Sequence, residues 1–183
     1  LQAIIRKMQW SITTLERCRV PVIAAIHGYC LGGAIALITA CDIRLAAADA
    51  IFGVRETRMA IVADIGTLQR LPRVIAPGIA RELVYTGRDF DAQYAERINL
   101  VNEVLDTRDN LLTKATQLAE EISANAPLAV QGSKQVMNAT HAADIDRELE
   151  YVSTWNTAHM ISQDLAHAIQ SFATKTAPEF KGR

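Results

Sequence analysis

The feature that most constrains this fold is an apolar, strand-like segment that leads through two adjacent glycines into an apolar helical stretch. Residues 20–28, "VPVIAAIHG", have the length and composition of a buried strand, and residues 33–41 have those of a short buried helix. Gly32 and Gly33 let one backbone pass close to another. The bare N–H groups at a helix start also hold negatively charged oxygens. From these residues alone, a packing role and an anion-binding role both stay open.

The rest of the chain divides into a mixed part and a helical part. The spacing of apolar residues and the positions of proline and glycine predict a helix over 1–18, two brief strands around a turn at Ala48 and Asp49, a loop over 56–64, helices near 66–75, 77–86 and 91–98, and a strand within 100–105. Three helical stretches with almost no strand signal follow. The sequence therefore predicts an α/β core over 1–106 and a helical region over 107–183.

The charge balance argues against two classes of partner. The chain has 183 residues, 50% of them hydrophobic, with 19 basic and 20 acidic side chains and a net charge of −1. Nucleic acids and anionic membrane surfaces both require a basic footprint, so neither is expected as the main partner. No apolar run reaches the length of about 20 residues that a membrane span needs.

Cysteine and histidine give no sign of a disulfide or a metal site. Three cysteines without CxxC spacing indicate reduced thiols in an intracellular protein. The histidines lack the spacing of metal ligands, and we expect no metal. Since no signal-peptide pattern is visible, we expect a soluble, cytoplasmic protein of bacterial type. The first residue is not Met, and we expect that the N-terminal part of the core precedes it.

Two carboxylates are the candidates for acid–base chemistry. Glu56 and Asp64 lie on either side of the mostly apolar "TRMAIVA". Acids beside an apolar surface suit proton transfer, because low polarity raises a carboxyl pKa toward neutrality. Each also has an ordinary explanation: Asp64 could cap the following helix, and Glu56 could pair with Arg55 or Arg58. For Asp42, after the short helix, we favour a structural role in binding backbone N–H groups.

Taken together, four segments resemble the enoyl-CoA hydratase/isomerase (crotonase) superfamily. They are "PVIAAIHGYCLGGAIALITACDIRLAAADAIFGVRE", "GTLQRLPRVI", "ARELVYTGRDFDAQYAERINLVNEV" and "PLAVQGSKQVMN". The resemblance implies an α/β fold, a crotonase-like spiral of β-β-α units with a C-terminal helical region that forms trimers, often paired into hexamers. Asn99 stands where the family usually has Gly, and Asn is the next-best residue for a left-handed helix end.

The resemblance also implies a chemistry for the glycines. In the family, the N–H at the position of Gly33 forms half of an oxyanion hole for the thioester carbonyl of an acyl-CoA. Gly32 and Ala36 would contact the substrate. The second oxyanion donor and the CoA-binding residues are expected upstream of residue 1. Coenzyme A is part of the substrate, so no separate cofactor is expected.

The acids then indicate a branch of the family. Hydratases carry a Glu where this chain has Ala36, whereas the pair Glu56 and Asp64 resembles the Δ(3,5)-Δ(2,4)-dienoyl-CoA isomerase branch of fatty acid β-oxidation. In that branch one acid takes a proton from C2 and another returns one at C6. Ala36 departs from this branch as well, because its members carry Asp there. Two alternatives stay open: another enoyl-CoA isomerase or hydratase using Glu56, and a non-catalytic subunit that binds CoA esters.

Overall fold

The computed structural model describes residues 2–59, 63–139, 163–176 and 181, which belong to two compact units. The first unit comprises Leu1–Cys18 and Val22–Thr116, and the second comprises Arg19–Pro21 and Gln117–Arg183. The division falls within a helix, further along the chain than the boundary at residue 106 predicted from the sequence.

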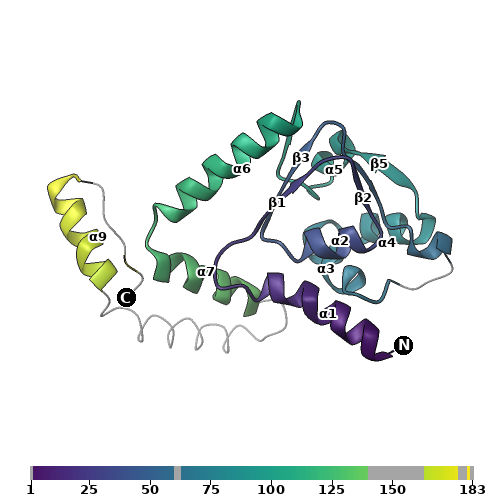
Figure 1. Ribbon diagram of the computed structural model, residues 1–183, viewed down its shortest axis with the longest axis horizontal. Helices are drawn as coiled ribbons and strands as arrows, with labels where there is room; N and C mark the ends of the chain where they lie inside the picture. Colours follow the sequence, from purple (N-terminus) through teal and green to yellow (C-terminus); the bar gives the residue numbers. More distant parts are fainter. Residues whose placement is uncertain (1, 60–62, 140–162, 177–180, 182–183) are drawn as a thin grey trace. The chain divides into compact units, whose positions relative to one another are not determined.

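Two small sheets form the centre of the first unit (Figure 1). The first sheet joins three parallel strands in the order β1 (Ile23–Ile26), β3 (Ile43–Ala47) and β6 (Glu103–Leu105). In the second, β4 (Ile51–Gly53) pairs in parallel with β2 (Tyr29–Leu31) and antiparallel with β5 (Asp89–Asp91). The two brief strands predicted around Ala48 and Asp49 are confirmed as β3 and β4, which the turn delivers to different sheets.

The helices predicted for the first unit are also confirmed. They are α1 (Gln2–Glu16), α2 (Gly33–Thr39), α3 (Thr67–Val74), α4 (Pro77–Thr86) and α5 (Ala92–Arg97). The predicted loop over 56–64 contains one turn of 3₁₀ helix, η1 (Glu56–Met59). Proline and glycine punctuate this part as expected, because Pro77 begins α4 and Gly87 ends it with φ 60°. Asn99 has φ 61°, which confirms the left-handed helix end predicted for it.

The C-terminal helices α6 (Arg108–Ser123), α7 (Pro127–Ala139) and α9 (Gln163–Thr174) agree with the predicted helical tail. Part of the third predicted stretch lies outside the described residues. Within the second unit, the buried Lys134 donates a hydrogen bond from Nζ to the carbonyl of Val20 at 3.0 Å. None of the described helices combines the length and hydropathy required to cross a membrane.

The core of the first unit is apolar and includes the inner faces of β4 and β5. Phe52 of β4 and Phe90 of β5 are directly paired across the strands, and their rings stack with centroids 5.6 Å apart. Such cross-strand aromatic pairs stabilise a sheet beyond the area that they bury. Leu71 of α3 and Leu83 of α4 belong to the same cluster. These contacts hold the end of β4, and Glu56 lies three residues further along the chain.

Polar groups tie the first sheet to its neighbours. Asp42 Oδ2 accepts a hydrogen bond from the backbone N–H of Val22 at 2.7 Å, which confirms its structural role. The buried Arg44 donates to the carbonyls of Leu100 at 2.8 Å and Cys41 at 2.7 Å. Burial lowers the pKa of this guanidinium. The two carbonyl oxygens provide hydrogen-bond acceptors for its buried N–H groups.

Thiol reactivity tests this packing. Cys30 of β2 is 3% exposed, and burial raises the pKa of its thiol to about 12, whereas Cys18 is half-buried. Since the thiolate is the reactive form, we expect a thiol-alkylating reagent at about pH 8 to modify Cys18 in the folded protein and Cys30 only after unfolding. Peptide mass spectrometry measures both rates. Rapid modification of Cys30 without denaturant would contradict this packing.

Candidate functional site

The two glycines occupy a tight turn that is anchored to β4. Gly32 has φ 55° and ψ −119°, a conformation open mainly to glycine, and its N–H donates to the carbonyl of Gly53 at 2.8 Å. Its own carbonyl accepts a hydrogen bond from the N–H of Ile35 at 2.8 Å. The N–H of Gly33 is the first of α2, where an α-helix provides no intrahelical acceptor. The N-cap residue, Gly32, has no side chain that could accept a hydrogen bond from this helix start.

Glu56 lies against this turn. It is the first residue of η1, and a methyl group added at Gly32 would be 3.7 Å from its Oε1 and 4.0 Å from its Oε2. Oε2 is buried without a hydrogen-bond partner among the described residues. Arg55, which the sequence offered as a partner for Glu56, pairs with Asp89 instead. A buried carboxylate oxygen without a partner is costly, and this arrangement is characteristic of functional sites.

Glu56 also lines a cavity of about 450 Å³. The other lining residues are mainly apolar. They come from the residue after β4, from the segment before α3, and from α3 and α4: Val54, Ala63, Leu68, Leu71, Pro72, Pro77, Ala80, Arg81, Val84 and Tyr85. Glu56 is the one acid among these lining residues. The cavity can therefore take an apolar group whose reacting atom lies beside a single carboxylate.

Asp64 is placed differently. Its side chain is exposed, and the residue lines a second cavity of about 400 Å³ together with Gln9, Thr13, Glu16, Ile65, Gly66, Gln69, Arg70 and Arg73. Its backbone carbonyl accepts a hydrogen bond from Gln9 Nε2 at 2.6 Å. The structure thus does not bring Asp64 into the cavity that Glu56 lines. The capping explanation is also wrong, because Gly66, with φ 115°, occupies the N-cap of α3.

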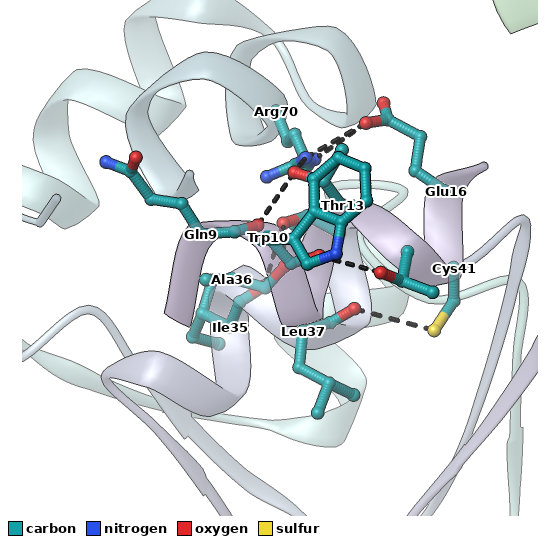
Figure 2. Close-up of polar contacts among 11 residues, drawn as sticks. Gln9, Trp10, Thr13, Glu16, Ile35, Ala36, Leu37, Cys41 and Arg70 are labelled. Atoms are coloured by element: carbon teal, nitrogen blue, oxygen red, sulfur yellow. Dashed lines mark hydrogen bonds and ion pairs between the residues drawn. The ribbon is translucent and has the colours of Figure 1, made fainter. Parts of the chain in front are cut away.

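An ion pair between α1 and α3 forms one side of this second cavity (Figure 2). Arg70 of α3 donates from Nη2 to Glu16 Oε2 at 2.9 Å and to Thr13 Oγ1 at 3.0 Å. The side chain of Arg70 is only 10% exposed. Its guanidinium also lies over Gly66, where any side chain would collide with it. The pair thus connects α1 to the turn that follows Asp64.

Ala36 lies in a small apolar cluster. It was expected to contact substrate, but it is fully buried and lines neither cavity. It packs with Ile12 of α1 and Ala40, and Leu15 and Ile65 complete this small apolar cluster. The face of α2 that carries Ala36 is covered by α1, so a small apolar residue fits there. The contact between these helices could not be read from the local sequence.

The wall of the Glu56 cavity that α4 provides was not predicted from the sequence. Arg81, Val84 and Tyr85 follow helical spacing, so they lie on one face of α4. Their spacing predicted a helix, but no residue pattern separated a cavity wall from ordinary core. Within the described parts of the chain, no cluster of three or more His, Cys, Asp or Glu could hold a metal ion.

The glycine turn gives a first test of this geometry. An alanine at Gly32 would adopt a strained backbone conformation, and we expect a stability loss of about 1–3 kcal/mol. At Gly33 the added methyl would be 3.1 Å from Ile65 Cδ1, the end of a side chain that can shift, so Gly33→Ala should cost less. Urea unfolding of both variants measures the difference. Equal losses would contradict the backbone assignment.

The burial of Ala36 gives a second test. An Asp at this position would place a carboxylate in an apolar cluster, and we expect Ala36→Asp to destabilise the protein by at least about 2 kcal/mol. Leu37→Asp is the matched control, since Leu37 is the next residue of α2 and is 45% exposed. Thermal or urea unfolding compares the two. Similar stabilities would show that Ala36 is not covered by α1.

Comparisons with known proteins agree with this fold and these motifs. The family model described as enoyl-CoA hydratase/isomerase matches residues 2–183. A mitochondrial Delta(3,5)-Delta(2,4)-dienoyl-CoA isomerase of Dictyostelium discoideum is 46% identical over 97% of this chain and 60% of that protein. A peroxisomal protein of the same name from Arabidopsis thaliana is 46% identical over 96% of this chain and 63% of that protein. This chain therefore spans about three fifths of the length of these relatives.

Solved structures described as enoyl-CoA hydratases have a fold similar to that of this chain. The crystal structure of an enoyl-CoA hydratase from Bacillus anthracis superposes with a TM-score of 0.95 and 36% sequence identity, over 100% of this chain and 70% of that one. A structure described as a putative enoyl-CoA hydratase, from Streptomyces coelicolor, also gives 0.95, at 28% identity. The chain belongs to the enoyl-CoA hydratase/isomerase family, and its α/β architecture is the crotonase fold.

Proposed function

We propose that this protein is an isomerase of unsaturated acyl-CoA thioesters, with Glu56 as a proton carrier. The observation that carries the proposal is the carboxylate of Glu56, which lies beside the Gly32 turn with one buried, unpartnered oxygen and also lines an apolar cavity. Support for the substrate class comes from the relatives named as dienoyl-CoA isomerases, at 46% identity.

The chemistry follows from the acidity of a thioester. Removing a proton from C2 moves negative charge onto the thioester oxygen, and the step becomes feasible when that oxygen is stabilised. In the proposal the N–H of Gly33 donates to this oxygen, a contact of a kind that lowers the barrier by roughly 2.7–4 kcal/mol. Glu56 takes the C2 proton and becomes a carboxylic acid. When an acid returns a proton further along the conjugated chain, the double bonds have shifted and the composition of the substrate is unchanged. If Glu56 itself returns the proton, its carboxylate is regenerated; if a second acid does so, the two carboxyl groups exchange protons with solvent before the next turnover.

For the branch, we propose the shift of a 3,5-dienoyl-CoA to a 2,4-dienoyl-CoA, with Asp64 as the acid at the far end of the diene. The identity to named dienoyl-CoA isomerases supports this choice. A second candidate is the shift of one double bond by Glu56 alone. The exposed position of Asp64 in a separate, polar cavity favours this second candidate.

Partners and location remain proposals as well. We propose that coenzyme A enters only as part of the substrate, without a separate cofactor, and that the protein assembles into homotrimers or hexamers and acts in fatty acid β-oxidation. The oligomer rests on the family resemblance alone. The names of the relatives specify mitochondria and peroxisomes, and so lend no support to the cytoplasmic location expected from the sequence.

A spectroscopic assay with 3,5-dienoyl-CoA and a 3-enoyl-CoA, side by side, tests the proposal. We expect Glu56→Gln to lower kcat by about 10²–10⁴-fold with both substrates, because an amide does not carry the proton. Asp64→Asn should lower kcat only with the dienoyl substrate if two acids act, and with neither if Glu56 acts alone. Asp49→Asn, at another exposed aspartate, is the control. Full activity of Glu56→Gln would exclude the proposed role.

A further inference from the structure

We propose that Arg55 and Asp89 are positioning residues for Glu56: their ion pair, which lies over Gly53, fixes the start of the turn that carries the Glu56 carboxylate. The inference rests on the proposed function for its kinetic consequence. The contacts that carry it join β4, β5 and η1, all within the first unit.

The ion pair has two-point geometry. Arg55 Nε donates to Asp89 Oδ1 at 2.7 Å, and Arg55 Nη2 donates to Asp89 Oδ2. A two-point pair between guanidinium and carboxylate fixes direction as well as distance, unlike a single contact. The hydrogen bond from Arg55 holds the pKa of Asp89 below its usual range, with Arg58 adding a weaker effect of the same sign. Asp89 is therefore ionised throughout the neutral range.

Gly53 makes room for this pair. In the antiparallel register of β4 and β5, Gly53 lies directly opposite Asp89. A methyl group added at Gly53 would be 2.8 Å from Asp89 Oδ1 and 3.5 Å from Arg55 Cγ. Only a residue without a side chain leaves this space to the carboxylate. The same Gly53 accepts the hydrogen bond from the N–H of Gly32, so the pair and the glycine turn share one anchor.

The placement of the Glu56 carboxylate depends on the turn that begins at Arg55. Its Oε2 has no hydrogen-bond partner among the described residues, so its position follows from the backbone. The carbonyl of Arg55 accepts the N–H of Arg58 at 3.0 Å, the hydrogen bond that closes the turn of η1 around Glu56. Holding the Arg55 side chain therefore holds the turn from which Glu56 projects.

Kinetics and amide NMR test the inference together. We expect Asp89→Asn and Arg55→Met to lower kcat by about 10- to 100-fold, with KM for the acyl-CoA within about twofold, since misplacing a reacting group costs rate more than binding. Arg55→Lys keeps the charge but not the two-point contact, so its kcat should lie between the values of these two variants and that of the parent protein. The double variant should be no worse than the worse single variant, because both changes act through one contact.

The control is Glu103→Gln, which breaks the similarly exposed Lys114–Glu103 pair away from the site. It should leave kcat unchanged. In a Glu56→Gln background, Asp89→Asn should add no further loss, as expected for a residue that acts through Glu56. The inference would be overturned if the parent protein turns over substrate and the kcat values of Asp89→Asn and Arg55→Met are within twofold of the parent value.

The amide spectrum separates this inference from the proposed function. We expect the ¹⁵N–¹H signals of Gly32 and Glu56 to move in Asp89→Asn and to stay in place in Glu103→Gln, whether or not the parent turns over acyl-CoA. A parent without turnover, but with these shifts, would refute the proposed function and support the positioning role. Unmoved signals in Asp89→Asn would overturn the positioning role.

Discussion

The hydrogen bond from the N–H of Gly32 to the carbonyl of Gly53 is the interaction on which the rest of the site depends. It extends the parallel pairing of β2 and β4 by one residue, into the turn that starts α2. The backbone that presents the Gly33 amide is thereby joined to the strand that leads to Glu56. One donor and one carboxylate, far apart in sequence, are thus held on a common frame that includes the stacked rings of Phe52 and Phe90.

Glu56 and Asp64 line two separate cavities with different walls. The cavity of Glu56 has mostly apolar walls, which suit an acyl chain, whereas the cavity of Asp64 is bordered by Arg70, Glu16 and other polar side chains from α1 and α3. The same packing of α1 that creates the second cavity covers Ala36. A carboxylate at position 36 would lie within this apolar contact with α1, where an unpaired charge is costly. The presence of Ala at position 36, where an acid was expected from the family resemblance, is thus consistent with how α1 packs.

Residues that act locally were predictable from the sequence. Pro77, Gly87 and Asn99 fix helix ends through their own backbone preferences, and each does so in the structure. The strands β2 and β5 were missed for local reasons: β5 is Asp-Phe-Asp, and Asp is uncommon in strands, while β2 is a short segment between Gly28 and Gly32. Glu56 was predicted as an acid–base residue from its apolar neighbours, and its place beside the glycine turn comes from the structure. The surroundings of Asp64 and Ala36 are set by α1, which no local pattern could indicate.

The proposed function requires that one thioester contact the Gly33 amide and the Glu56 carboxylate together. The most direct measurement is a crystal structure of the protein with acetoacetyl-CoA, whose enolate mimics the charged intermediate. We predict the thioester oxygen at about 3 Å from the Gly33 nitrogen and C2 within about 3.5 Å of a Glu56 carboxylate oxygen. A bound ester with its thioester remote from Gly33, or with Glu56 turned away from C2, would contradict the account.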